Sequence, residues 1–199
     1  MKTSLSDPRV IRTCSQLRDS LMMLVAEKSF AYLTIQDVTK RAGLNRTTFY
    51  LHYTGLHELL EDCAWTLFDQ MRESIYANKP VDYSQNTSQL EPFVESVFRH
   101  LEEHEKFYRA MLGKQGDPFF RGLFQEFLSE LIFEPILLKA TSKDPDLQLD
   151  MALRFFSAGF TEIASWWLDT GMPIPIEQAS RQIIRDILPG YLRLVHDRG

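Results

Sequence analysis

Apolar residues recur at steps of three and four along most of the chain, and this spacing predicts helices rather than strands. The first expected helix has a start signal in Asp7, which can cap it, and in Pro8, which fits a first helical turn. Its apolar positions then fall on one face: Val10, Cys14, Leu17, Leu21 and Leu24. Such a helix packs that face against a core.

Two short helices follow, separated by a tight turn. Thr34 and Asp37 have the spacing of a capping box, in which each residue caps the backbone of the other. Gly43 suits the end of this helix, and Asn45 suits the cap of the next one. Two short helices joined by a turn that contains glycine predict a helix-turn-helix.

The rest of the chain also has helical spacing. A fourth helix is expected from about Gly55 through "LHELLEDCAWTLFDQMRESI", and Pro135 and Pro189 are expected to bend or break later helices. The expected fold is all-α, with a three-helix helix-turn-helix domain in residues 1–55 and a second helical domain in residues 56–199. The later helices are expected near 91–103, 105–115, 118–140, 147–169 and 176–197.

Charge is unevenly distributed between these two parts. The formal net charge is −5, but residues 1–60 carry eight Lys or Arg against five Asp or Glu, and residues 61–199 carry fourteen against twenty-two. The basic first third therefore calls for a separate interpretation from the acidic remainder. No long apolar run suggests a signal peptide or a membrane span, so we expect a cytoplasmic protein with no membrane partner.

The segment "GLNRTTFYLHY" has an unusual outer face. On a helical wheel Phe49 and Tyr53 point toward the preceding helices, and the outward positions carry no acidic residue. Arg can bond guanine in a major groove, Thr or Leu51 can contact a thymine methyl group, and Tyr or His can bond phosphates. The alternative interpretation is a solvated helix face beside core aromatics.

These residues carry a resemblance to a known family. "LTIQDVTKRAGLNRTTFYLHYTGLHELL", Leu33 to Leu60, closely resembles the helix-turn-helix of the tetracycline-repressor (TetR) family of bacterial transcriptional regulators. The resemblance implies that the third helix reads the major groove and that Thr34 anchors a phosphate. It places the other DNA-binding positions at Arg46, Thr47, Thr48, Tyr50 and His52. Leu51 is a further DNA-binding candidate, because its side chain suits a thymine methyl group.

The sequence departs from the family pattern at three positions. Ser29 stands near the usual glycine, Thr39 replaces the usual alanine, and Leu56 occupies the position of a lysine that typically binds phosphate. Losing one cationic contact should weaken binding and reduce its salt dependence by roughly one counterion. Lys2, Arg9 and His57 are the candidates that could substitute.

The helix expected near 147–169 is apolar on two sides. One stripe is interpreted as domain core: Leu149, Leu153, Phe156, Phe160, Ile163 and Trp167. The other, together with part of the last helix, is expected at a homodimer interface built as a four-helix bundle: Met151, Ala158, Thr161, Ser165, Leu168, Ile184 and Leu188. The alternative is that both stripes belong to the core of one chain.

Aromatic residues are dense in the C-terminal part. Most should pack in the core, yet together they could line an apolar cavity for an uncharged or amphipathic effector. The resemblance also implies that residues 1–55 form the DNA-binding domain and residues 56–199 a ligand-binding and dimerisation domain, with an effector cavity below the fourth helix. The candidate ligand-binding residues are Trp65, Phe68, Phe98, Phe107, Met111, Phe127, Phe155 and Trp166.

The stretch "HLEEH", from His100 to His104, matches the His-x-x-Glu-His signature of some zinc enzymes. The simpler interpretation is a charged helix end, and we expect no metal, no cofactor and no enzymatic activity. The expected function is a ligand-responsive repressor that binds palindromic operator DNA as a homodimer. The alternatives are a metal-dependent helical enzyme using His100 and His104, and an effector-less dimer that binds DNA or acts as a structural or protein-binding module.

Overall fold

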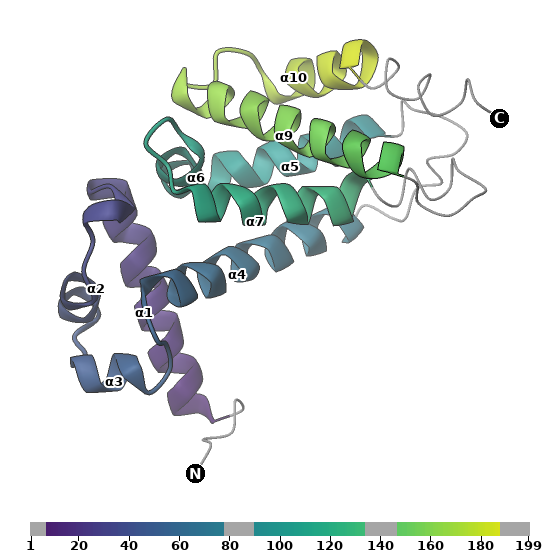
Figure 1. Cartoon of the computed structure of the whole chain (residues 1–199). Coiled ribbons are helices and arrows are strands. Elements are labelled where there is room, and N and C mark those ends of the chain that lie inside the picture. Colours follow the sequence, from purple (N-terminus) through teal and green to yellow (C-terminus); the bar gives the residue numbers. More distant parts are fainter. Residues whose placement is uncertain (1–6, 78–89, 134–146, 188–199) are drawn as a thin grey trace.

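The computed structural model describes residues 7–77, 90–133 and 147–187, which form helices and contain no strand (Figure 1). The N-terminal part contains α1 (Pro8–Glu27), the short 3-10 helix η1 (Phe30–Tyr32), α2 (Ile35–Ala42) and α3 (Arg46–Tyr50). The long helix α4 (Leu56–Ala77) then runs from these helices into the C-terminal part (Figure 1). No helix among the described residues is both long and apolar enough to span a membrane.

The C-terminal part is a layered bundle. Its elements are α5 (Glu91–Glu103), α6 (Glu105–Leu112), α7 (Pro118–Leu128), the π-helix η3 (Ser129–Phe133), α9 (Leu147–Asp169), α10 (Ile176–Gln182) and the π-helix η4 (Ile183–Ile187). The expected all-α fold is confirmed, and η1 was not anticipated. The bends expected at Pro135 and Pro189 lie outside the described residues.

The short N-terminal helices begin and end where local signals place them. Thr34 accepts a hydrogen bond from the Asp37 N–H at 3.2 Å, and the Asp37 carboxylate accepts one from the Thr34 N–H at 2.9 Å. Gly43 ends α2 with φ 67°, a left-handed conformation that glycine adopts without strain. Asn45 caps α3 by accepting from the Thr48 N–H at 2.7 Å.

A small apolar core holds these helices against α4. Leu17 and Leu21 of α1 meet Val38 of α2 and Phe49 of α3 in a fully buried cluster. Phe49 is 0% exposed, so α3 is fixed by one deeply inserted ring although it is only five residues long. Helices this short are unstable alone, and tertiary packing provides their stability.

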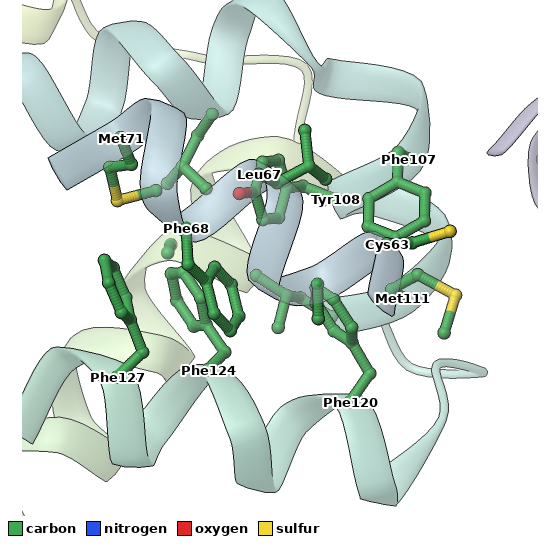
Figure 2. Packing of buried hydrophobic residues seen from close by; sticks show 14 of the residues in the cluster. Cys63, Leu67, Phe68, Met71, Phe107, Tyr108, Met111, Phe120, Phe124 and Phe127 are labelled. Carbon is green, nitrogen blue, oxygen red and sulfur yellow. The ribbon is translucent and has the colours of Figure 1, made fainter. Parts of the chain in front are cut away.

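A larger aromatic core fills the space between α4 and α7 (Figure 2). Phe68 of α4 stacks on Phe127 at 4.5 Å between ring centroids and lies 5.9 Å from Phe124. Phe107 of α6 meets Phe120 edge to face at 5.3 Å. Edge-to-face and offset contacts are favourable arrangements for aromatic rings, and they join three helices here.

The end of α6 lies against α9 at close range. The Leu112 carbonyl accepts a hydrogen bond from the Ser165 hydroxyl at 2.8 Å, and the Leu168 carbonyl accepts one from Arg109 Nε at 2.9 Å. A side chain at Gly113 would come within 2.8 Å of the Asp169 carboxylate. Gly113 therefore allows the two backbones to approach, and Ser165 and Arg109 satisfy carbonyls at the ends of α6 and α9 respectively.

Candidate nucleic-acid interface

The outward side of α3 and the turn after it forms an exposed surface with no acidic residue between positions 45 and 54. Arg46 and Thr47 are exposed, and the exposed fractions of Tyr50 and Leu51 are 51% and 74%. Phe49 and Tyr53 are buried on the opposite side, as the helical wheel predicted. The arrangement gives one arginine, one hydroxyl, one phenol and one aliphatic side chain a common direction into solvent.

Two of the expected DNA-binding side chains have partners inside the protein. The Thr48 hydroxyl donates to the Asn45 side chain at 3.0 Å, so it supports the cap of α3. His52 is half-buried beside Tyr53, with 6.5 Å between the ring centroids.

Arg46 lies near Tyr50, with 3.5 Å between its guanidinium nitrogen and the phenol oxygen. Arg46, Thr47, Tyr50 and Leu51 therefore project most freely.

Thr34 at the start of α2 is exposed, and its hydroxyl donates to the Asp37 carboxylate at 2.8 Å. These hydrogen bonds, with a smaller contribution from Lys28, hold the pKa of Asp37 below its usual value. In this geometry Thr34 organises the helix start. A phosphate contact by Thr34 stays a prediction.

The start of α4 differs from a phosphate-binding site. The Glu58 carboxylate accepts hydrogen bonds from the Thr54 N–H and hydroxyl, both at 2.6 Å, and these bonds lower its pKa. Leu56, at the position of the usual lysine, is half-buried against the apolar core. An acidic residue therefore occupies the first turn, where the helix dipole would otherwise favour a phosphate.

His57 faces the C-terminal part of the protein. Its ring meets Phe30 edge to face at 5.1 Å and Phe119 at 5.3 Å, and its Nε2 lies 3.6 Å from the Asp117 carboxylate. Of the three residues considered as replacements for the lysine, His57 is thus engaged with η1 and α7. Arg9 is exposed at the start of α1, and Lys2 lies outside the described residues.

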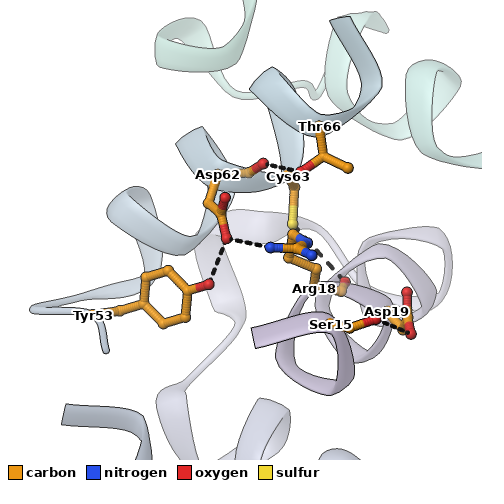
Figure 3. A network of polar contacts seen from close by, with 7 residues as sticks. All are labelled: Ser15, Arg18, Asp19, Tyr53, Asp62, Cys63 and Thr66. Carbon is orange, nitrogen blue, oxygen red and sulfur yellow. Dashed lines mark hydrogen bonds and ion pairs between the residues drawn. The ribbon is translucent and has the colours of Figure 1, made fainter. Parts of the chain in front are cut away.

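A polar network joins α1, the turn after α3 and α4, and it was not predicted from the sequence (Figure 3). Asp62 of α4 accepts hydrogen bonds from Arg18 of α1 at 2.8 Å and from the Tyr53 hydroxyl at 2.5 Å. Burial opposes the charge on Arg18, but the hydrogen bond and attraction to Asp62 raise its pKa overall. Burial and the bond to Asp62 raise the pKa of Tyr53, which keeps its hydroxyl protonated as a donor.

Comparison with known proteins decides the family. A family model described as transcriptional regulator C-terminal region, TetR_C_8, matches residues 88–188. A second, described as bacterial regulatory proteins, tetR family, matches residues 17–63. The chain belongs to the TetR family. The first model covers about half of this TetR-family chain, and the second covers α2, α3 and their surroundings.

Related proteins agree with this assignment. A stretch of 56 residues is 41% identical to the uncharacterized HTH-type transcriptional regulator YxbF of Bacillus subtilis (strain 168), and covers 28% of this chain and 15% of that relative. A TetR transcriptional regulator from Streptococcus agalactiae 2603V has the same fold, with a TM-score of 0.65, 22% identity and coverage of 96% and 97% of the two chains. The dihydroxyacetone kinase operon activator DhaS matches with a TM-score of 0.58, 20% identity and coverage of 92% and 97%.

The expected effector-binding residues of this TetR-family chain divide into two groups. Phe155 and Trp166 are 72% and 48% exposed on α9, outside the aromatic core, and their contact with an effector stays a prediction. Trp65 is half-buried on α4. The others lie inside the aromatic core, where a contact with an effector stays a prediction: Phe68, Phe98, Phe107, Met111 and Phe127.

The expected dimer-interface residues also divide. Met151 and Ala158 are exposed on α9, and Leu188 lies outside the described residues. The remaining four are buried within one chain, with exposed fractions of 0–5%, and their placement at a subunit interface stays a prediction: Thr161, Ser165, Leu168 and Ile184. The reason for their burial is the approach of α6 and α5 to this side of α9 and α10, where Ser165 bonds the Leu112 carbonyl.

The network at Asp62 gives a testable expectation for stability. Asp62→Asn removes the anionic partner of Arg18 and should lower the free energy of unfolding by about 1–3 kcal/mol, because a half-buried charge-assisted hydrogen bond is lost. Asp69→Asn is the matched control, since Asp69 lies on the same helix in an exposed pair with Arg72 and should contribute at most about 1 kcal/mol. Urea denaturation followed by circular dichroism measures both, and equal effects would contradict the structural role of the network.

Proposed function

We propose that this TetR-family chain binds a palindromic operator as a homodimer through α3 and that a largely apolar effector releases it. The observation that carries the proposal is the exposed face of Arg46, Thr47, Tyr50 and Leu51, which projects from a fixed scaffold and has no acidic neighbour on α3. These side chain types suit guanine, thymine and phosphate. A regulator of this kind acts where bacterial DNA is, in the cytoplasm.

Electrostatics also favour the N-terminal part as the DNA-binding part. Residues 1–60 have an excess of three positive charges, whereas residues 61–199 have an excess of eight negative charges. Long-range attraction would therefore orient the N-terminal helices toward DNA and the C-terminal bundle away from it. We propose that the DNA-binding domain ends at residue 55 and that the ligand-binding and dimerisation domain begins at residue 56, the start of α4, although α4 packs in both parts.

Repression is the simpler regulatory outcome. A dimer that covers a promoter blocks the polymerase with no further interaction surface, whereas activation needs one. DhaS, which shares the fold, is named an activator, so the fold alone does not decide the sign.

The dimer would form through the exposed apolar side of α9. Met151, Phe155 and Trp166 lie on one helical face, with exposed fractions of 63%, 72% and 48%, and exposed Ala158 and Gly159 lie between them. Exposed aromatic side chains gathered on one helical face often mark an interaction site, and the charged Glu162 on this face is paired with Arg121. The small residues in the middle would let two copies of α9 approach closely across a two-fold axis.

The effector would act on the aromatic core through α4. Phe68 and Met71 of α4 belong to that core, and Leu59 and Leu60 near the start of the same helix belong to the core beneath α3. An apolar molecule that displaces rings around Phe68 would shift α4, and the DNA-binding helices would move with it. Such a molecule acts only as far as its affinity differs between the two arrangements.

The DNA-binding face is tested by DNA selected from a random duplex pool, followed by titration of variants. Arg46→Ala should cost about 1–3 kcal/mol per half-site and relax the preference for one guanine, because a bidentate contact to its O6 and N7 is lost. Tyr50→Phe should instead weaken binding to all sequences similarly, as expected for a phosphate contact. Uniform weakening by Arg46→Ala would show that Arg46 contacts only the backbone, and selected DNA without dyad symmetry would refute the dimeric mode.

The dimer is tested by placing a charge on the exposed side of α9. Phe155→Glu should raise the dimer dissociation constant at least about tenfold, because it removes a large apolar contact and buries a carboxylate. Tyr76→Glu is the matched control, since Tyr76 is an exposed aromatic residue on α4 with a 53% exposed fraction. Analytical ultracentrifugation distinguishes the outcomes, and a wild-type monomer at micromolar concentration or an unaffected Phe155→Glu dimer would exclude this interface.

Effector coupling is tested by linkage. A ligand found by thermal shift should lower operator affinity by a factor that corresponds to about 1–3 kcal/mol, and the operator should weaken ligand binding by the same factor. Titration of the ligand into the protein–operator complex and of the operator into the protein–ligand complex measures both sides of the cycle. A ligand that binds tightly yet leaves operator affinity unchanged would refute the sensing mechanism without affecting the DNA-binding assignment.

A further inference from the structure

A cluster of metal-ligand side chains lies where α5 ends and α6 begins. His100, Glu103 and His104 each offer one possible ligand atom, and these atoms lie within 4.8 Å of one another. His100 and His104 are separated by one helical turn, with 4.7 Å between their ring centroids. The proposed DNA-binding function uses none of the three residues.

The surroundings of His100 resemble those of a ligand rather than of an ordinary core residue. Its side chain is 4% exposed, and its Nε2 lies 3.1 Å from the hydroxyl of the buried Tyr108. Imidazoles that bind metal ions usually engage their second nitrogen in a hydrogen bond of this kind, which fixes the ring orientation. Tyr108 engages Nε2, so Nδ1 is the nitrogen that would bind an ion in this orientation of the ring.

The other two residues give the cluster access to solvent. His104 is half-buried with φ −113° and ψ 30°, a break in the helical path between α5 and α6. Glu103 is exposed at the last position of α5. An ion could enter from the Glu103 side and reach a buried imidazole without opening the core.

We propose that His100, Glu103 and His104 form a binding site for a divalent transition metal ion, with zinc as the best match. Two imidazoles and one carboxylate are a ligand set that suits zinc, and three protein ligands leave a fourth tetrahedral position for water or an added ligand. Ligand atoms on one zinc ion lie about 3.3 Å apart, given bond lengths near 2.0–2.1 Å. The ligand atoms, which lie within 4.8 Å of one another, would have to approach further by rotation of the Glu103 and His104 side chains.

A bound ion would also affect the DNA-binding part. It would hold His104, the residue between α5 and α6, to the last turn of α5, and α6 packs against α1. Metal binding could then change the orientation of α1 and, through the shared core, that of α3. This consequence rests on the proposed operator binding, whereas the metal site itself does not.

The site is tested with the purified full-length chain after chelator treatment. Zinc titrated in competition with a chromophoric chelator should bind at one ion per chain, and cobalt should give the strong visible absorption of a tetrahedral site. His104→Ala and Glu103→Gln should each weaken zinc binding at least about tenfold. Both are preferable to a change at His100, whose burial against Tyr108 makes misfolding a concern.

Two controls make the test decisive. Glu102→Gln removes an exposed neighbouring carboxylate outside the cluster and should leave zinc affinity unchanged, and His57→Asn removes a histidine elsewhere on the surface with the same expectation. Absence of stoichiometric zinc binding, or equal binding by wild type and His104→Ala, would overturn the site. If the wild type binds zinc while its measured operator affinity does not change, the regulatory consequence alone is overturned.

Discussion

The fold depends on α4 being buried along its length in a continuous apolar core, first against the N-terminal helices and then in the aromatic bundle. Leu59, Leu60 and Cys63 near its start have 0% exposed side chains among the DNA-binding helices, and Phe68 and Met71 are equally buried in the aromatic bundle. A sharp kink in a helix needs a local cause such as proline, glycine or a π-bulge, and α4 contains no proline or glycine, so displacement at one end is largely transmitted to the other. The same constraint fixes the thiol of Cys63, whose pKa is raised by burial, as a packing group.

The junction between the N-terminal helices and the C-terminal bundle combines apolar and polar contacts of different strength. Asp62 joins Arg18 and Tyr53 at hydrogen-bond distance on one side of α4, and His57 joins Phe30 and Phe119 by ring edges on another. The Asp62 contacts are charge-assisted and hold α1 and the end of the helix-turn-helix to α4. The ring contacts of His57 are weaker and partly exposed, so they allow α7 and the N-terminal part to shift relative to each other at small cost.

Local sequence signals predicted the helix-turn-helix well, because its caps are determined by neighbouring residues. Thr34 with Asp37, Gly43 and Asn45 occupy the predicted positions. The orientation of α9 could not be predicted in this way. Thr161 and Ser165 have the small side chains of a helix interface, but the bond from Ser165 to Leu112 shows that the partner is α6 of the same chain. Phe155 and Trp166 looked like core aromatics, and only the packed bundle shows that they face outward.

Ion pairs within the protein reduce the positive charge that is available to attract DNA phosphates. Arg41 pairs with Glu27 at 2.6 Å and Lys28 pairs with Asp37 at 3.5 Å, so two cations near the DNA-binding helices are already partly neutralised. Leu56 adds no charge at the position where the family usually has a lysine, and Glu58 occupies the first turn of α4. Each phosphate contact adds about 0.9 to the slope of log affinity against log salt. In the proposed binding mode, a smaller number of such contacts makes the base contacts of Arg46, Thr47 and Leu51 a larger share of the binding free energy.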